Sequence, residues 1–173
     1  VGIALIYWTP DHGSAVSIKS PDPRRNLGDH AAQMRAEEVK RRFANSVGLL
    51  GTKQFDAAAS ELHRVLELEP QMPEAHVNMG FAMIGAGRHA LARDFFSSAI
   101  ELRTNQLNAY YGLAVALEGL GDIAGALGAM RSYVHLSKAD DAYLMKANAA
   151  IWEWEDELRK APAGSGIKPD RKP

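Results

Sequence analysis

The stretch Gly51-Thr-Lys-Gln-Phe55 returns further along the chain as Gly85-Ala-Gly-Arg-His89, and after an equal step as Gly119-Leu-Gly-Asp-Ile123. Other positions repeat with the same step, and each keeps its type of side chain. Small residues, large apolar residues, alanines and leucines form four such columns: Ser46, Gly80 and Ala114; Leu49, Met83 and Leu117; Ala58, Ala92 and Ala126; and Leu68, Leu102 and Leu136. A fixed step of this length indicates a chain built from stacked structural repeats.

Each unit has the hydrophobic pattern of two amphipathic helices. In the first unit, Phe43, Val47 and Leu50 precede Gly51, and apolar residues resume at Phe55 with spacings of three and four. This spacing predicts helices. The glycines near Gly51, and their equivalents in the next two units, predict the breaks between helices, because glycine readily takes the positive φ that ends a helix. The small residues of each first helix are expected to face the alanine of the second, so that the two helices approach closely.

The pattern resembles the tetratricopeptide repeat over residues 39–140. The resemblance rests on Pro70, which ends the first unit, and on the small-residue pairs Ser46/Ala58, Gly80/Ala92 and Ala114/Ala126. It implies an all-α, right-handed α-solenoid of about three helical hairpins, closed by a C-terminal capping helix over Ala142–Lys160. The sequence departs from the family pattern in a few columns: Asn45 replaces an apolar residue, the partly aromatic column reads Leu62, Phe96 and Met130, and Thr104 and Lys138 replace the terminal proline.

The two ends of the chain differ in composition from the repeats. Residues 1–8 are apolar and end in Tyr7 and Trp8, residues 9–28 read as an extended linker, and residues 161–173 read as a flexible tail rich in proline and glycine. The solenoid with its capping helix is expected over residues 29–160, with Asp29 as the N-cap of a helix that begins near His30. Three interpretations of residues 1–8 stay open. They are the end of a membrane anchor, which the aromatic pair favours, a segment packed on the domain, and a secretory signal.

The resemblance also implies where a partner binds. In this family one face of each first helix lines a concave surface, which usually holds a segment of another protein. On this chain that face forms an apolar groove edged by charge. Its residues are Lys40, Phe43, Val47 and Leu50 in the first unit, Val77, Phe81 and Ile84 in the second, Asn108, Tyr111 and Val115 in the third, and Trp152 in the capping helix. Two alternatives stay open: some of these side chains belong to the core, or the groove is filled by the chain's own ends or by a second copy.

One branch of the family binds the C-terminal carboxylate of chaperones with a clamp of Lys, Asn and Arg on this face. Here the corresponding positions are apolar or aromatic and supply no cationic fork: Phe43, Val47, Phe81, Tyr111 and Val115. We therefore do not expect this chain to bind a chaperone tail.

Two other aromatic features lie outside this set. Trp152 and Trp154 are two residues apart and therefore point to different sides of a helix, one into the core and the other into the groove or onto the surface. His76 falls in an apolar column of the repeat and is expected to be packed.

The composition excludes several classes of function. The chain has 173 residues with 20 Lys and Arg against 21 Asp and Glu, so its net charge of −1 removes the electrostatic basis for a general nucleic-acid binder. The absence of cysteine excludes a disulfide framework, a Cys-ligated zinc site and a thiol nucleophile. The histidines show no i, i+4 pairing, and the sequence has no phosphate-binding loop after a strand. We therefore expect no enzyme activity, no metal site and no cofactor.

Together these features predict a non-catalytic adaptor or assembly scaffold that binds a segment of another protein. We expect it to be tethered through its N-terminal segment to a membrane or a membrane complex, with the repeats on the bacterial periplasmic side. A permanent structural subunit of a larger membrane complex and a soluble cytosolic adaptor are the alternatives. The sequence indicates no particular partner.

Overall fold

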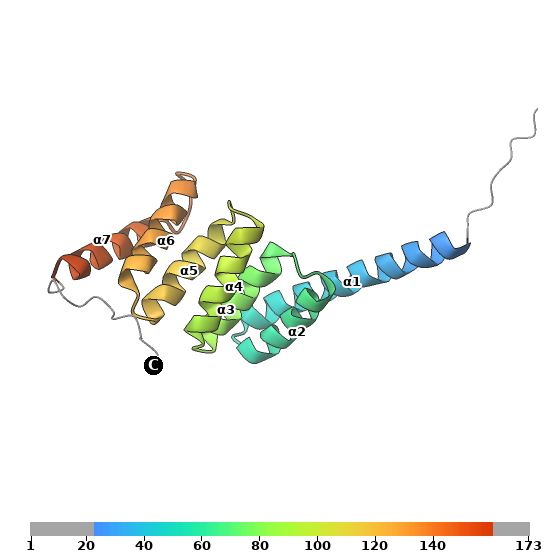
Figure 1. Cartoon of the computed structure of the whole chain (residues 1–173). Helices are drawn as coiled ribbons and strands as arrows, with labels where there is room; N and C mark the ends of the chain where they lie inside the picture. The colour runs from blue at the N-terminus through green and yellow to red at the C-terminus, as the bar shows by residue number, and fades with distance from the viewer. Residues whose placement is uncertain (1–22, 161–173) are drawn as a thin grey trace, which may run out of the picture. The chain divides into compact units, whose positions relative to one another are not determined.

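The structure, a computed structural model, describes residues 23–160 of the chain (Figure 1). Within this range seven helices follow one another and no strand occurs. They are α1 (Pro23–Gly51), α2 (Phe55–Leu68), α3 (Pro73–Gly85), α4 (His89–Leu102), α5 (Leu107–Gly119), α6 (Ile123–Leu136) and α7 (Leu144–Lys160). The starts of α2, α4 and α6 are separated by the step found in the sequence, as are the starts of α3 and α5. The prediction of an all-α helical repeat is confirmed.

The chain divides into two units, Val1–Met34 and Arg35–Pro173, and α1 contains residues of both. In the first unit, residues 28–34 of α1 expose their side chains. In the second unit, α1 is joined to α2 by Arg42, whose guanidinium lies 2.9 Å from the Glu61 carboxylate. Each later helix then contacts the next one along the chain. The repeats and the site described below belong to this second unit.

Helix α1 begins at Pro23, earlier than the start near His30 that the sequence suggested. Proline is well suited to the first position of a helix, because its φ is already helical and its missing N–H would have no partner there. The last six residues of the expected linker, 23–28, are therefore helical. The expected anchor segment, the rest of the linker and the C-terminal tail fall on residues 1–22 and 161–173, outside the described residues.

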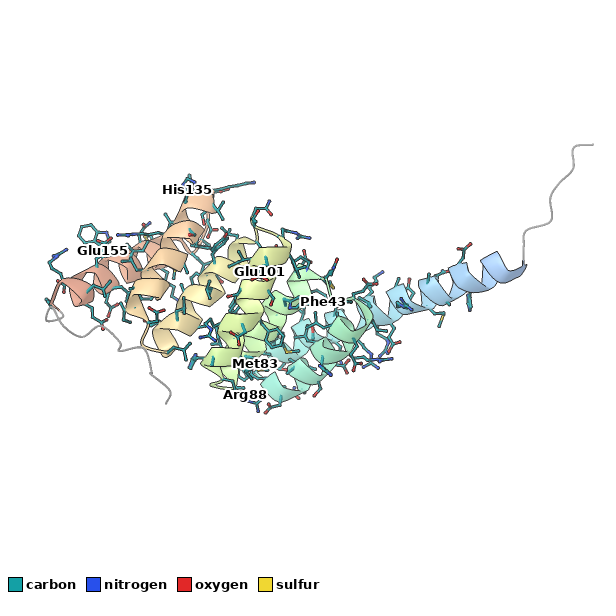
Figure 2. The ribbon with its side chains drawn as sticks, in the orientation of Figure 1. Phe43, Met83, Arg88, Glu101, His135 and Glu155 are labelled. Atoms are coloured by element: carbon teal, nitrogen blue, oxygen red, sulfur yellow. The ribbon has the colours of Figure 1, made fainter. Side chains whose placement is uncertain are left out.

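The turn within each repeat has the same backbone geometry in all three units. Lys53, Gly87 and Gly121 occupy the same position in successive repeats and have φ values of 60°, 72° and 78°. In each turn the next residue donates a backbone hydrogen bond to the carbonyl five residues earlier, as Arg88 does to Met83 at 2.8 Å. Figure 2 labels these two residues. This is the bonding of a Schellman motif, which needs a left-handed residue after the helix. In the first unit the left-handed residue is Lys53 and not Gly51, which is the last residue of α1.

Two glycines allow α3 and α5 to approach the second helix between them. The ring of Phe96 in α4 is completely buried. A Cβ atom built on Gly80 would lie 2.6 Å from Cζ of Phe96, and one built on Gly112 would meet the same ring atom more closely still. Both positions therefore exclude a side chain, because real Cβ contacts are longer. Gly80 therefore allows the close approach that the sequence predicted for its column, but the nearest side chain is that of Phe96 and not that of the predicted Ala92.

A second pair of glycines lies against the first residues of α2 and α4. Phe55 begins α2 and packs on Gly85 of the next repeat, and His89 begins α4 and packs on Gly119 in the same way. The two contacts are equivalent and join successive repeats. Stacking of this kind lets each hairpin bury a face that it cannot bury alone.

None of the helices in residues 23–160 combines the length and the apolar character needed to cross a membrane.

Candidate functional site

A pocket lies on the face formed by the first helices of the second and third repeats. Helices α3 and α5 contact each other although α4 separates them in the sequence. The pocket has a volume of about 300 Å3. Four aromatic side chains and one amide line it, from α3, α5, α6 and the turn before α7: Phe81, Asn108, Tyr111, Tyr133 and Tyr143.

The aromatic rings of the pocket pack on one another at inclined angles. The centroid of the Tyr111 ring lies 5.3 Å from that of Tyr133, with 64° between the ring planes. The same ring lies 5.8 Å from Tyr143, at 55°. Phe81 packs edge-on against the buried Phe96 at 5.1 Å. Such tilted contacts add to the energy of apolar burial, and they connect the pocket wall to the core.

An aspartate holds the far wall of the pocket in place. The Tyr133 hydroxyl donates a hydrogen bond to Oδ1 of Asp141 at 2.7 Å, and the backbone N–H of Tyr143 donates to the same oxygen at 2.8 Å. The bond from Tyr143, followed by the bond from Tyr133, holds the pKa of the Asp141 carboxyl below its usual value. Burial, followed by the hydrogen bond to Asp141, raises the pKa of Tyr133 to about 12. At neutral pH the pair is therefore a neutral phenol donating to a carboxylate.

The far wall of the pocket is formed where the spacing between successive first helices departs from the repeat step. Helix α3 begins at Pro73 and α5 begins at Leu107, so the next first helix is due at position 141. Helix α7 instead begins at Leu144, three residues late. The extra residues form the turn that carries Asp141 and Tyr143. The capping helix was expected from Ala142, and its later start places Tyr143 in this turn and not on the helix.

Three of the groove residues proposed from the sequence lie together in this pocket: Phe81, Asn108 and Tyr111. The sequence missed Tyr133 and Tyr143, which complete it. Tyr133 lies on a second helix, and the expected groove drew only on the first helices and the capping helix. Tyr143 depends on the late start of α7, which the spacing of the repeats does not indicate.

The other proposed groove residues lie outside the pocket. Val77 requires a correction, because it is only 3% exposed and belongs to the core, where no partner can reach it. Partly buried side chains at three further positions pack against the same core: Phe43, Leu50 and Ile84. The remaining positions are exposed or half-buried: Lys40, Val47, Val115 and Trp152. Their role in binding stays a prediction.

The two tryptophans of α7 lie on different sides of the helix, as their spacing predicted. Trp154 is 3% exposed and its indole N–H donates to Glu118 of α5 at 3.1 Å. Trp152 is 77% exposed. Trp154 therefore fastens the last helix to the third repeat, and Trp152 is free of the core.

The described residues show no constellation suited to a metal ion. Within residues 23–160 no group of three His, Asp or Glu side chains has the arrangement for one. His76, expected to be packed, lies 6.1 Å from the Phe95 ring between centroids, and its Nε2 is 2.8 Å from the carbonyl oxygen of Pro70.

Comparison with known proteins agrees with this architecture. A sequence model of the tetratricopeptide repeat matches residues 49–101. The BBSome complex member BBS4 of Xenopus tropicalis is 31% identical over 130 residues, which cover 74% of this chain and 25% of that protein. The chain therefore spans only about a quarter of the length of this relative.

Solved structures show the same fold at low sequence identity. The tetratricopeptide domain of Sgt2 from Aspergillus fumigatus has a TM-score of 0.66 and 18% identity, covering 79% of this chain and 89% of that domain. The type III secretion chaperone SycD of Yersinia enterocolitica, in complex with a peptide of the translocator YopD, has a TM-score of 0.66 and 10% identity, covering 70% and 95%. The described helices therefore form an α-solenoid. Residues 49–101 belong to the tetratricopeptide repeat family, and the described helices share the fold of its domains.

Proposed function

We propose that this chain is a non-catalytic adaptor that binds a segment of a partner protein across the face formed by α3 and α5. The observation that carries the proposal is the aromatic pocket of about 300 Å3 on that face. Its walls come from two successive repeats and from the turn before α7, so the pocket depends on the stacking of the repeats. A binding site made in this way matches the use of helical repeats as extended recognition surfaces.

The exposure of the pocket residues supports this function. Tyr143 is 57% exposed, while Phe81 and Tyr111 are half-buried. Aromatic side chains of this kind provide much of the energy of protein interfaces. At roughly 25 cal/mol per Å2, covering a few hundred Å2 of apolar surface supplies several kcal/mol before the cost of ordering the partner.

The structural relatives support the same type of ligand. SycD, which shares the fold, has been solved with a peptide of a translocator protein. A peptide segment of another protein is therefore a ligand that this architecture accommodates. The segment bound by the present chain is defined by its own pocket residues, because the sequence identity to SycD is only 10%.

Site-specific photocrosslinking tests the proposal. A photoreactive amino acid replaces Asn108 in the pocket, and in a matched variant it replaces Leu91, which is 49% exposed and outside the pocket. Both full-length variants are expressed in the organism that encodes the protein and are irradiated in living cells. We expect a discrete crosslinked product from position 108 only. Equal products from both positions, or none from position 108, would contradict the proposal.

We also propose, from the apolar segment Val1–Trp8, that the adaptor is tethered to a membrane, with the repeats on the periplasmic side of a bacterial cell. Eight residues are too few to span a bilayer but suit the end of a longer span. Cell fractionation of the natural protein and of a variant lacking residues 1–8 tests this. We expect the natural protein in the membrane fraction and the variant in the soluble fraction. Equal distribution of the two would remove this part of the proposal.

A permanent place in a larger assembly is the second candidate. The relative BBS4 is a member of the BBSome complex, which favours this candidate for a chain with the same repeats. Size-exclusion chromatography of the native extract distinguishes the two. A permanent subunit elutes entirely in one large complex, whereas an adaptor elutes partly as the free chain.

A further inference from the structure

We propose that the aromatic pocket receives the ammonium group of a lysine side chain on the bound segment. This inference rests on the proposed function, because it specifies which feature of a partner the pocket recognises. Three properties of the pocket carry it: its aromatic lining, the charge beside it and the inclination of its walls.

The rings provide the first argument. Three tyrosine rings line the pocket and lie in contact, with centroids 5.3 and 5.8 Å apart around Tyr111. A cation within about 6 Å of a ring centroid is attracted by the negative face of the ring, and several rings around one cation add their effects. A pocket of about 300 Å3 has room for the end of a lysine side chain among these rings.

The charge beside the pocket provides the second argument. Its lining contains no Lys or Arg. The Asp141 carboxylate bonds directly to the Tyr133 hydroxyl and to the backbone of Tyr143, two residues of the lining. In the described part of the chain, Asp141 forms no ion pair with a basic side chain, whereas several other acidic residues do, such as Glu61 and Glu155. Its negative charge therefore remains available to attract a cation.

The hydrogen bond from Tyr133 strengthens this effect. A phenol that donates to a carboxylate at 2.7 Å carries more electron density on its ring than a phenol bonded to water. Tyr133 is 2% exposed, so water does not weaken this bond as it would at the surface. Because so little of Tyr133 is exposed, the rings that a lysine can reach are those of Tyr111 and Tyr143, and Tyr133 acts on the cation only through its electrostatic field.

The inclination of the walls favours lysine over arginine. The planes of the neighbouring rings make angles of 64° and 55° with Tyr111, so these walls are not parallel. A planar guanidinium stacks best on a flat aromatic face, whereas a compact ammonium group suits a rounded site. The Asn108 side chain adds an amide oxygen that accepts a hydrogen bond from an ammonium group.

An apolar anchor is the main competing occupant. A site built for leucine or phenylalanine gains nothing from a carboxylate that is held by the pocket wall, nor from an amide in its lining. Covering the Asn108 amide with an apolar side chain costs free energy, because its hydrogen bonds to water are lost. The composition of the pocket therefore favours the cation, and the apolar occupant becomes an outcome of the test.

Titration of the full chain with two short peptides tests the inference. One peptide carries a single lysine between glycines, and the other carries norleucine, which has an aliphatic chain without charge, at the same position. Both have blocked ends, and binding is followed by NMR shifts of the Asn108 side-chain amide. We expect the lysine peptide to bind about three to ten times more tightly than the norleucine peptide, with its advantage reduced at high salt.

Two variants of Tyr143 distinguish the contribution of its aromatic ring to lysine binding from the contributions of its hydroxyl group and of its apolar volume. Tyr143 is exposed and lies in a turn, so its replacement leaves the buried core intact. Tyr143→Phe retains the aromatic face and is expected to keep the preference for lysine. Tyr143→Leu retains apolar volume without the π face and is expected to lower lysine affinity several-fold, with little change for norleucine. A melting curve of each variant checks that it is folded.

The outcomes distinguish this inference from the proposed function. Equal or tighter binding of norleucine at the pocket overturns the lysine inference and leaves the adaptor function standing with an apolar anchor. Absence of shifts at Asn108 with either peptide also overturns the inference, and the adaptor function then depends on the photocrosslinking result alone. Loss of lysine binding in Tyr143→Phe overturns the role of the ring face.

Discussion

Gly112 and Gly80 set how closely the first helices approach the second helix between them. Phe96 fills the space that a side chain at either glycine would need. The ring is completely buried and packs against Phe81 of the pocket wall, so it has little room to move. The stability of the repeat stack and the position of one pocket residue therefore depend on the same contact.

Replacement of Gly112 with alanine is expected to destabilise the protein. The added methyl group overlaps the Phe96 ring, and overpacking of this kind costs about 1–3 kcal/mol. Gly128→Ala is the matched control, because Gly128 lies in helix α6 with open space around it. There the substitution is expected to stabilise by about 0.5–1 kcal/mol, since alanine favours helix. Urea denaturation measures both, and equal effects at the two sites would contradict the steric role of Gly112.

Lys53 occupies a position that glycine occupies in the other two repeats. Its φ of 60° is unfavourable for a residue with a Cβ atom. Lys53→Gly is therefore expected to raise stability by about 0.5–1 kcal/mol, after the greater freedom of glycine in the unfolded chain is subtracted. Lys53→Ala keeps the Cβ atom and is expected to change little. Thermal melts of the two variants and of the natural protein measure these changes. A lower melting temperature for Lys53→Gly would contradict the view that the backbone is strained at Lys53.

The buried Tyr133 hydroxyl makes the free energy of unfolding vary with pH in the alkaline range. Its pKa is raised to about 12 in the folded protein, whereas a tyrosine in an unfolded chain ionises near pH ~10. The unfolded state therefore releases the proton first, so the contribution of this group is complete below about pH 10 and is lost as pH rises toward 12. Tyr133→Phe lacks the group, so its melting temperature is expected to fall less steeply in this range. Parallel slopes for the two proteins would contradict the assignment.

At the scale of the residue, part of the helix packing and turn geometry could be predicted from the sequence. The small column at Gly80 was visible in the spacing, because a constant repeat step preserves a steric requirement. The position of Lys53 also aligns with Gly87 and Gly121, although the sequence pattern suggests the helix break at Gly51. The role of Gly112 was not visible, because it depends on where the Phe96 ring lies between two helices.

At the scale of the element, the last helix shows where the repeat pattern loses its predictive value. The repeat step places a helix start at position 141, but α7 begins at Leu144. Asp141 accepts bonds from Tyr133 and from the backbone of Tyr143, which hold the intervening turn outside the helix. Periodicity describes what the repeats share, so it gives no indication of a turn that occurs once.

Helix α7 is fastened to the third repeat by Trp154. Replacing this buried side chain with alanine is expected to cost about 3–5 kcal/mol, because a large cavity forms and the bond to Glu118 is lost. Trp152→Ala, on the exposed side of the same helix, is expected to change stability by less than about 0.5 kcal/mol. Circular dichroism melts of the two variants check this. Similar losses for both would mean that α7 packs differently.

At the scale of the whole molecule, the sequence predicted the class of fold and the general place of the candidate site. The face of the first helices was identified from the repeat phase, and Phe81, Asn108 and Tyr111 lie together on it. Val77 was placed on that face by the same reasoning but is buried. A periodic pattern gives the direction of a side chain around its helix, whereas burial depends on the neighbouring repeat that covers it.

The central claim is that the pocket face holds a partner protein. Affinity purification of the tagged full chain from the organism that encodes it, quantified by mass spectrometry, tests this claim when it compares the natural chain with Tyr143→Lys and Leu91→Lys. Both substituted side chains are exposed, at 57% and 49%, so both variants retain the core. A lysine at position 143 repels a bound ammonium group and also disfavours an apolar occupant, so we expect one set of partners to be captured by the natural chain and by Leu91→Lys, and to be lost from Tyr143→Lys. Retention of the same partners by Tyr143→Lys would contradict the claim.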